Sequence, residues 1–410
     1  MRLPGKTSGT AECADTGNGE KDTQITPFHG RLCAFIIEWQ AYISVNLHAL
    51  MNNKEWRCLS FIEELSNMNS TVKAAIPTTM RALFVDEIDG PFVLREIPVP
   101  PVGAGQVLVR IAASGVNPLD TKIRAGKGGH ACHPFPAVLG MDMAGTVVGI
   151  GQDVAGFSVG DDVFGFTGGI AGIQGSLAEY AAVDARLLAR KPANLSMREA
   201  AALPLIFITA WEGLVDRAGV EADDYVLVHG GVGGVGHVAV QIAQSVGAKT
   251  FATVRSGDFE AASAFGAIPI DYARESVEQY VAERTAGEGF DIVFDTVGGD
   301  VLDASFRAAK NYRGHVVSAL GWGTHALAPL SFRSATYSGV FTLLPLLTGK
   351  ERAHHGDILR QAARLVDAGK LRVRMDAHRF GLEDVEAAHQ LVASGKSEGK
   401  VVIDVFGATK

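Results

Sequence analysis

Residues 225–250, YVLVHGGVGGVGHVAVQIAQSVGAKT, decide the fold of this 410-residue chain. The first five are β-branched, aromatic or aliphatic apart from the closing His229, and they predict a strand covered on both faces. A glycine-rich turn follows, and then a helical pattern that ends at Gly247, a residue type common just after a helix. A buried strand, a glycine turn and a helix in this order predict a β-α unit of a parallel sheet.

The glycines of the turn have the spacing G-x-G-x-x-G, at Gly231, Gly233 and Gly236. We expect Gly231 to allow the tight turn, Gly233 to admit a pyrophosphate, and Gly236 to let the helix press against the strand. The free N–H groups at the helix start would then face the phosphates. With 48 glycines in the chain a purely structural turn is the alternative, but the position between strand and helix predicts a dinucleotide site. The expected contacts are Gly231, Val232, Gly233, Gly234, Val235 and Gly236.

Composition excludes several classes of protein. Hydrophobic residues make up 47% of the chain and charged residues 20%, which is ordinary for a globular protein with a sizeable core. A net charge of −8 and the lack of a basic patch with interleaved aromatics argue against a nucleic-acid partner. No apolar run is long enough for a membrane span. The four cysteines show no disulfide framework, which favours the reducing cytoplasm.

Residues 1–79 differ from the rest of the chain. Residues 1–27 are polar and glycine-rich, which predicts disorder, and residues 31–65 have the pattern of one or two amphipathic helices. Met68 and Met80 are alternative starts. We expect this extension to be dispensable; a targeting or partner-binding arm is the alternative.

From Met80 the pattern becomes regular and suggests two domains. Short strand patterns separated by Gly and Pro turns predict a partly open β-barrel. After Leu205, strands and helices alternate, which predicts a doubly wound parallel sheet. A last strand near the C-terminus would return to the first domain and make it discontinuous. The expected α/β architecture is therefore a barrel domain of residues 80–205 and 345–410 and a nucleotide-binding domain of residues 206–344.

At this point the chain resembles zinc-independent medium-chain dehydrogenase/reductases of the quinone oxidoreductase (zeta-crystallin) type. The segments that carry the resemblance are NPLDTKIRAG, LGMDMAGTVVGIG, PLIFITAWEGL, HGGVGGVGHVAVQIA, FDTVGG and GKVVIDV. They occur in the family's order, and the resemblance covers residues 80–410. It implies a GroES-like barrel domain and a Rossmann domain with the cofactor in the cleft between them, assembled as a homodimer or homotetramer. Lys400, in the last segment, is expected at the cofactor site.

The resemblance also predicts that no metal is bound. Asn117 stands where zinc alcohol dehydrogenases carry a Cys ligand, and Gly140-Met141-Asp142 stands where they carry G-H-E. A third catalytic Cys is missing as well, whereas zinc needs three N or S ligands and an open position. His130, Cys132 and His133 are an alternative set of ligands, but their cramped spacing and the lack of an obvious fourth ligand favour a loop without metal.

The segment after the second strand of the nucleotide-binding domain indicates which cofactor is used. Enzymes specific for NAD place an acidic residue there, but this chain has Arg255 and Ser256. The planar fork of Arg255 suits a 2′-phosphate, and the resemblance adds Tyr272, although a packed strand-end tyrosine is the alternative. Asp258, an acidic residue nearby, would favour NADH unless it is a helix N-cap. A lysine that helps to bind the 2′-phosphate in the family is replaced here by Phe259. We predict NADPH rather than NADH.

Without zinc, an ordinary ketone or alcohol oxygen is not strongly polarised, so quinones and α,β-unsaturated carbonyls are the expected acceptors. The segments that match the family imply that Asn117, Lys122, Asp142 and Thr209 are the catalytic residues. Asn117 would donate to the substrate oxygen, and Lys122 would stabilise an anion where several quinone reductases have Tyr. Thr209 would hold the nicotinamide end. Asp142 would lie at the pocket floor or only orient its neighbours. A turn asparagine, a solvated lysine and a helix-start threonine are the structural alternatives.

The sequence is compatible with three functions. The first is an NADPH-dependent quinone reductase, and the second is an NADPH-dependent reductase of the C=C bond of enones, enals or enoyl thioesters. The third is an NADPH-binding protein with little turnover, in a structural or sensor role. The glycine turn fits all three, because it concerns only the cofactor.

Overall fold

The computed structural model describes residues 76–406. The predictions for the first 75 residues, including the helices, the start at Met68 and three of the four cysteines, lie outside the described residues. The described part belongs to one compact unit that begins at Ile76.

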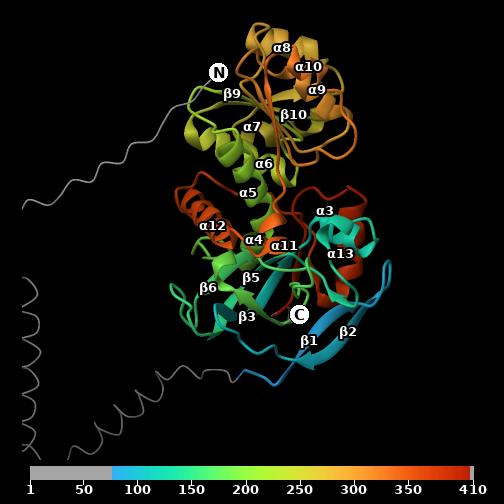
Figure 1. Ribbon diagram of the computed structural model, residues 1–410, viewed down its shortest axis with the longest axis vertical. Helices are drawn as coiled ribbons and strands as arrows, with labels where there is room; N and C mark the ends of the chain where they lie inside the picture. Colours follow the sequence, from blue (N-terminus) through green and yellow to red (C-terminus); the bar gives the residue numbers. More distant parts are fainter. Residues whose placement is uncertain (1–75, 407–410) are drawn as a thin grey trace, which may run out of the picture. The chain divides into compact units, whose positions relative to one another are not determined.

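A six-stranded parallel sheet is built around the glycine-turn segment (Figure 1). Its strand order, β11-β10-β9-β12-β13-β14, is that of a Rossmann fold, and every neighbouring pair is parallel. The last strand in this order, β14, lies at one edge of the sheet. The strands are β9 (Tyr225–His229), β10 (Lys249–Val254), β11 (Ile268–Asp271), β12 (Ile292–Asp295), β13 (His315–Ser318) and β14 (Thr336–Gly339).

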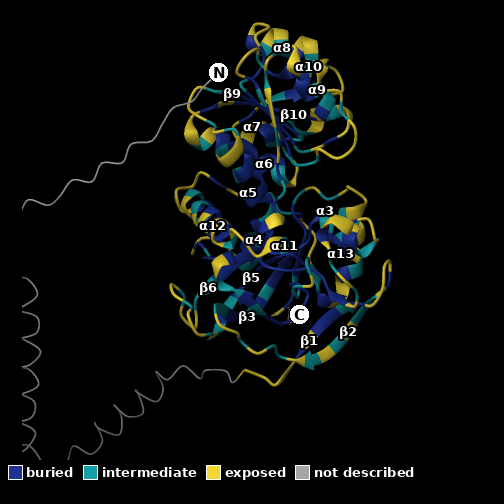
Figure 2. Cartoon of the chain, viewed as in Figure 1, coloured by how far each residue is buried: buried dark blue, intermediate teal, exposed yellow. Residues whose placement is uncertain are grey.

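The central strands β9, β10, β12 and β13 are buried almost throughout, and Figure 2 shows the labelled strands β9 and β10 largely dark blue. Along β9, Val226 and Val228 belong to one hydrophobic cluster and Leu227 belongs to another on the opposite face. The helices between the strands are α6 (Gly234–Val246), α7 (Phe259–Ala264), α8 (Val277–Thr285), α9 (Asp300–Ala308) and α10 (Ala328–Ser331). Buried side chains of α6 and α7 join the first cluster and those of α8, α9 and α10 join the second, so the sheet is doubly wound. The predicted fold class is confirmed.

The other strands form an antiparallel lobe. A seven-stranded sheet has the order β15-β16-β3-β5-β6-β8, with β7 also paired to β3, and a three-stranded sheet has the order β2-β1-β4. Among the described strands the larger sheet does not close on itself, in agreement with a partly open barrel. The strands are β1 (Thr79–Val85), β2 (Phe92–Pro98), β3 (Gln106–Gly115), β4 (Ala137–Val138), β5 (Asp142–Ile150), β6 (Asp162–Phe166), β7 (Tyr180–Asp184), β8 (Leu188–Arg190), β15 (Phe380–Gly381) and β16 (Val402–Asp404).

The C-terminal segment returns to this lobe. β16 pairs antiparallel with β3, joining Val402 to Gly115 and Asp404 to Ala113. Helix α12 (Arg352–Asp367) contacts β8, and α13 (Val385–Ala393) contacts α3 (Pro118–Arg124). The chain therefore crosses between the two lobes twice, which brings Lys400 beside residues of α3.

Helices α4 (Met197–Ala202) and α5 (Pro204–Trp211) make the first crossing. Ser196 and Glu199 form a capping box at the start of α4. Helix α5 contacts α6 of the parallel lobe and β5 and β6 of the antiparallel lobe, and Figure 1 shows it between the two sheets. It continues as a π-helix, Glu212–Arg217, before the chain enters β9.

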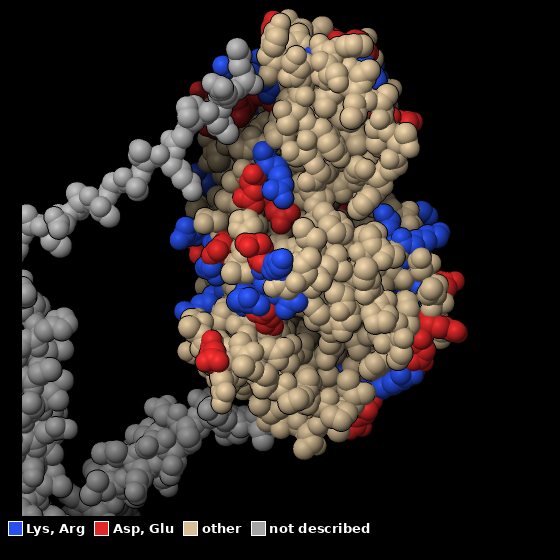
Figure 3. Space-filling view, in the orientation of Figure 1, with Lys and Arg blue, Asp and Glu red and all other residues tan. Residues whose placement is uncertain are grey.

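On the face of the molecule seen in Figure 3, acidic and basic side chains are intermixed and no large area of one sign stands out. Among the helices of residues 76–406, none is long and apolar enough to cross a membrane.

Candidate active site

The glycine turn between β9 and α6 has the predicted form, with one change in the roles of its glycines. Gly230 adopts the left-handed conformation, with φ of +67°, and makes the tight turn that we expected of Gly231. A Cβ at Gly231 would overlap Ala252 on β10, and a Cβ at Gly236 would overlap the carbonyl oxygen of Gly230. Gly231 and Gly236 are therefore required for close packing of the turn.

The residues of this turn fit the phosphates of a dinucleotide. Gly233 is the N-cap of α6 and is exposed, as is Gly234. The N–H groups of the first helical turn have no acceptor within the helix, and the helix dipole places partial positive charge there. A Cβ at Gly233 would have only the Gly230 oxygen nearby, at 3.2 Å, so its outer side is open to a ligand. An exposed, donor-rich helix start of this kind is suited to a pyrophosphate.

A cleft of about 430 Å³ lies beside the turn and takes its walls from both lobes. It sits at the carboxyl ends of β9 and β12, where the strand order reverses and where ligands bind in such sheets. Thr296, in the FDTVGG segment after β12, lines it and donates to the carbonyl oxygen of His229 at 2.6 Å. The predicted site residues that line the cleft are Asn117, Lys122, Thr209, Gly233, Gly234, Val235 and Lys400.

Asn117 is the N-cap of α3, but its side chain is fully buried and does not cap the helix. Its Nδ2 donates to Oδ2 of Asp142 at 2.9 Å, and its Oδ1 accepts from Nζ of Lys400 at 2.5 Å. A flipped amide would place Nδ2 against the ammonium and Oδ1 against the carboxylate, so this orientation is fixed. One Nδ2 hydrogen remains after the bond to Asp142, and it is the donor that Asn117 can offer to the cleft.

Asp142 does not line the cleft, so the structure favours the alternative in which it orients its neighbours. It lies fully buried at the start of β5, where its Oδ1 accepts from the backbone N–H of Leu205 at 2.9 Å. Nζ of Lys400 lies 3.7 Å from its Oδ2. Burial raises the pKa of Asp142 to about 6, although Lys400 and Asn117 oppose the shift. Burial also lowers the pKa of Lys400, against the attraction of Asp142.

Asp120 is a second buried carboxylate in this network, and the sequence reasoning missed it. Its Oδ2 accepts from the backbone N–H of Asn117 at 2.8 Å, and its Oδ1 has no hydrogen-bond partner among residues 76–406. Burial is the main cause that raises the pKa of Asp120 to about 7, and the charge of Asp142 adds to it. Its place three residues after Asn117 was the one available signal, and it indicated only a helix cap.

Thr209 lies inside α5, not at its start, which contradicts the helix-start explanation of this residue. Its hydroxyl donates to the carbonyl oxygen of Leu205 at 2.7 Å, one turn earlier. The oxygen keeps its capacity to accept, and it faces the cleft beside the glycine turn. Thr209 can therefore accept from a carboxamide N–H of a nicotinamide ring.

The residues predicted for the 2′-phosphate gather at the carboxyl ends of β10 and β11. Nε of Arg255 donates to Oη of Tyr272 at 3.1 Å, and both side chains are exposed. Oγ of Ser256 donates to Asp271 at 2.5 Å. Because the bond to Tyr272 uses only Nε, the two terminal nitrogens of Arg255 remain for a phosphate.

The neighbouring Asp258 is the N-cap residue of α7, as proposed, although its side chain makes no capping bond. It pairs with Arg374 instead, Nη2 to Oδ1, at 3.3 Å. Nη1 of Arg374 also donates to the carbonyl oxygen of Val232 in the glycine turn, at 3.1 Å. Arg374 comes from the C-terminal segment and offsets the charge of Asp258; nothing in the local sequence indicates this contact.

The described residues do not fit zinc. Residues 76–406 contain no group of three or more His, Cys, Asp or Glu side chains placed to hold a metal ion. His133 accepts from the backbone N–H of Gly172 at 3.1 Å, Cys132 is exposed, and His130 faces the cleft. The three residues considered as a replacement site are therefore not gathered around one point.

A doubly wound sheet with this glycine turn, joined to an antiparallel lobe across a shared cleft, defines a two-domain dinucleotide-dependent oxidoreductase. Comparison with known sequences agrees. A family model described as an alcohol dehydrogenase GroES-like domain matches residues 103–193, and one described as a zinc-binding dehydrogenase matches residues 265–403.

Three related proteins show how far the similarity extends. The 2-methylene-furan-3-one reductase of Solanum lycopersicum is 34% identical over 345 residues, 82% of this chain and 81% of its own. The chloroplastic NADPH-dependent alkenal/one oxidoreductase of Arabidopsis thaliana is 33% identical over 347 residues, 82% of each chain. The crystal structure of an alcohol dehydrogenase superfamily protein from Novosphingobium aromaticivorans is 58% identical, with a TM-score of 0.78, over 80% of this chain and 100% of that one.

The chain therefore belongs to the medium-chain dehydrogenase/reductase superfamily, as the resemblance predicted. It is an oxidoreductase of a family that uses nicotinamide dinucleotides and acts on small molecules.

Proposed function

We propose that this protein is an NADPH-dependent reductase that delivers hydride to the C=C bond of α,β-unsaturated carbonyl compounds. The observation that carries the proposal is the fixed amide of Asn117, with a free N–H beside the glycine turn in a cleft whose residues do not fit zinc. Two relatives support the choice of acceptor, because one is named for a methylene-furanone and the other for alkenals and alkenones.

In this proposal each cofactor-binding residue has a separate task. The N–H groups at the start of α6 bind the pyrophosphate, and Arg255 with Tyr272 binds the 2′-phosphate. The oxygen of Thr209 accepts from the nicotinamide carboxamide. The bound cofactor supplies the hydride.

On the acceptor side, Asn117 and Lys122 act on the carbonyl oxygen, where negative charge collects as the β carbon is reduced. The N–H of Asn117 donates to it, and the ammonium of Lys122, which lines the same cleft, adds positive charge. Lys400 and Asp142 hold the Asn117 amide in the donating orientation, so they are positioning residues. Donors that are fixed before the reaction need no reorganisation as the charge develops.

Quinone reduction is the second candidate. Lys122 lines the cleft, and its ammonium would stabilise a hydroquinone anion as well as an enolate. The departure from Tyr at this position does not distinguish the two acceptors. A purified sample with NADPH, offered an enone, a quinone and an ordinary ketone, separates them by the loss of absorbance of the reduced nicotinamide.

We expect the enone to be reduced with the highest kcat/KM and the ketone not at all. Asn117→Ala should lower kcat for the enone by about a hundredfold or more, as loss of one oxyanion donor does in other enzymes. Asn194→Ala is the matched control, because this asparagine donates to Val366 and does not line the cleft. Tight NADPH binding without turnover of any acceptor would instead favour a binding protein.

We further propose that the protein is a homodimer or homotetramer located in the cytoplasm. The edge strand β14 leaves one side unpaired within the described residues, and Phe332, just before it, is 86% exposed. Exposed edges and large apolar side chains commonly mark interfaces. Sedimentation of the purified protein and of Phe332→Glu tests this part separately from catalysis.

A further inference from the structure

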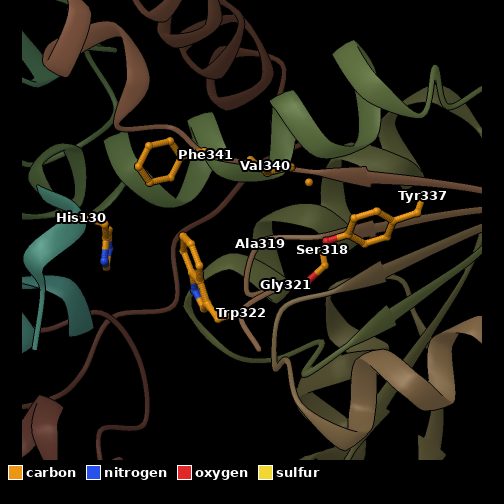
Figure 4. A pocket seen from close by; sticks show the side chains of 9 residues that line it. His130, Ser318, Ala319, Gly321, Trp322, Tyr337, Val340 and Phe341 are labelled. Carbon is orange, nitrogen blue, oxygen red and sulfur yellow. The ribbon is translucent and has the colours of Figure 1, made fainter. Parts of the chain in front are cut away.

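A side compartment of about 300 Å³ opens next to the cleft and is not used by the contacts described so far. Three aromatic side chains, His130, Trp322 and Phe341, line both spaces, so the compartment and the cleft lie side by side and share a wall. Tyr337 and Ser318 line its other end, on the far side of Trp322 in Figure 4. His130 comes from the antiparallel lobe and the other residues come from the parallel lobe.

The three shared rings contact one another, with the ring centres of His130 and Phe341 6.1 Å apart, and all three line the compartment. The ring centres of His130 and Trp322 are 5.1 Å apart with planes at 31°, and those of Trp322 and Phe341 are 6.2 Å apart with planes at 86°. Trp322 nevertheless remains 53% exposed. This uncovered aromatic surface at the edge of the cleft is available for contact with a ligand ring.

The compartment is also free of formal charge. None of the side chains that line it is Lys, Arg, Asp or Glu. Burial, with the nearby charge of Lys122, lowers the pKa of His130, so its imidazole is neutral at neutral pH. An ionic group, such as a phosphate, would have no partner here. A flat apolar ring could pack against these aromatic side chains, either offset-stacked or edge to face.

We propose that the compartment formed by His130, Trp322, Phe341 and Tyr337 binds the aromatic ring of an aryl-substituted conjugated carbonyl compound. The carbonyl then lies in the main cleft at Asn117 and Lys122. This inference rests on the proposed function, because it names the substrate class for the same site. It makes Trp322 a specificity-determining residue that contacts the ring of the substrate and leaves the cofactor contacts untouched.

The test compares two enones that differ only in their substituent, 4-phenyl-3-buten-2-one and 3-penten-2-one. The wild-type protein should have the higher kcat/KM for the phenyl compound. Trp322→Leu should lower that value by about tenfold, in line with the energy of an aromatic pair, and should leave the value for 3-penten-2-one within about twofold. Trp322→Phe should restore most of the loss. Phe406→Leu, which removes an exposed aromatic ring outside the cleft, should change neither value.

A binding measurement keeps the inference testable without turnover. Calorimetric titration of the saturated ketone 4-phenyl-2-butanone into the protein with NADP⁺ should give a dissociation constant that Trp322→Leu weakens by a similar factor. The affinity for NADPH itself should not change. Equal effects of Trp322→Leu on both enones, or no preference of the wild type for the phenyl compound, would overturn the aromatic subsite. No turnover with either enone would instead refute the proposed function, and the titration alone would then decide on the subsite.

Discussion

The buried carboxylate of Asp120 provides the sharpest test of the network behind Asn117. Burial raises its pKa from 3.8 to about 7, so the folded protein holds a proton that the unfolded chain loses at lower pH. Below about pH 4 both states carry the proton. Between about pH 4 and 7 only the folded state keeps it, so the contribution of Asp120 to stability falls as the pH rises.

The size of the effect follows from the same shift. About three pKa units at 1.36 kcal/mol each give a loss of roughly 4 kcal/mol by pH 8, as an upper limit. Asp120→Asn removes the ionisation, and its Oδ1 can still accept from the N–H of Asn117, the bond that is now 2.8 Å long. The variant should therefore gain stability relative to the wild type as the pH rises from 5 to 8.

Urea unfolding at pH 5, 6, 7 and 8 measures this difference directly. The free energy of unfolding of Asp120→Asn minus that of the wild type should increase by about 2 kcal/mol or more over this range. Asp86→Asn is the control, because this carboxylate is exposed and paired with Arg95 at the surface, and its difference should stay nearly constant. A difference for Asp120→Asn that does not depend on pH would show that Asp120 is already ionised in the folded protein, and the reasoning would fail.

Four further predictions concern the cofactor, the acceptor and the metal. Arg255→Ala should lower kcat/KM with NADPH by at least about tenfold and leave the NADH value unchanged; an equal loss with both cofactors would refute the 2′-phosphate contact. Lys122→Ala should lower kcat for an enone by about tenfold without changing the NADPH dissociation constant, and unchanged turnover would remove Lys122 from the mechanism. Gly236→Ala should abolish thermal stabilisation by NADPH, because its Cβ meets the Gly230 carbonyl, whereas Gly129→Ala, with open space at its Cβ, should not. Dialysis against a chelator should leave activity intact, and stoichiometric zinc found by elemental analysis would contradict the metal-free site.

The sequence by itself determined the parts of this protein that depend on local periodicity and steric constraint. Gly236 shows this, because a strand followed by G-x-G-x-x-G and a helix requires a residue without Cβ where helix and strand touch. The same local patterns predicted the parallel sheet and placed the basic residue Arg255 where NAD-specific enzymes have an acidic one. They placed the tight turn one residue late, because either Gly230 or Gly231 can take a positive φ and only the packing against Ala252 distinguishes them.

Tertiary structure alone decided how the residues around the cleft are held in place. Lys400 reaches Asn117 across 283 positions of sequence, and Arg374 reaches Asp258 across 116. Neither pair shares a helix face or a strand register, so no periodicity in the chain reports it. The same holds for the ring of Trp322 beside His130, which exists only because the two lobes close on one cleft. The raised pKa of Asp120 depends on the removal of water by the segments packed around it. Such burial is a property of the packed molecule and not of the local sequence.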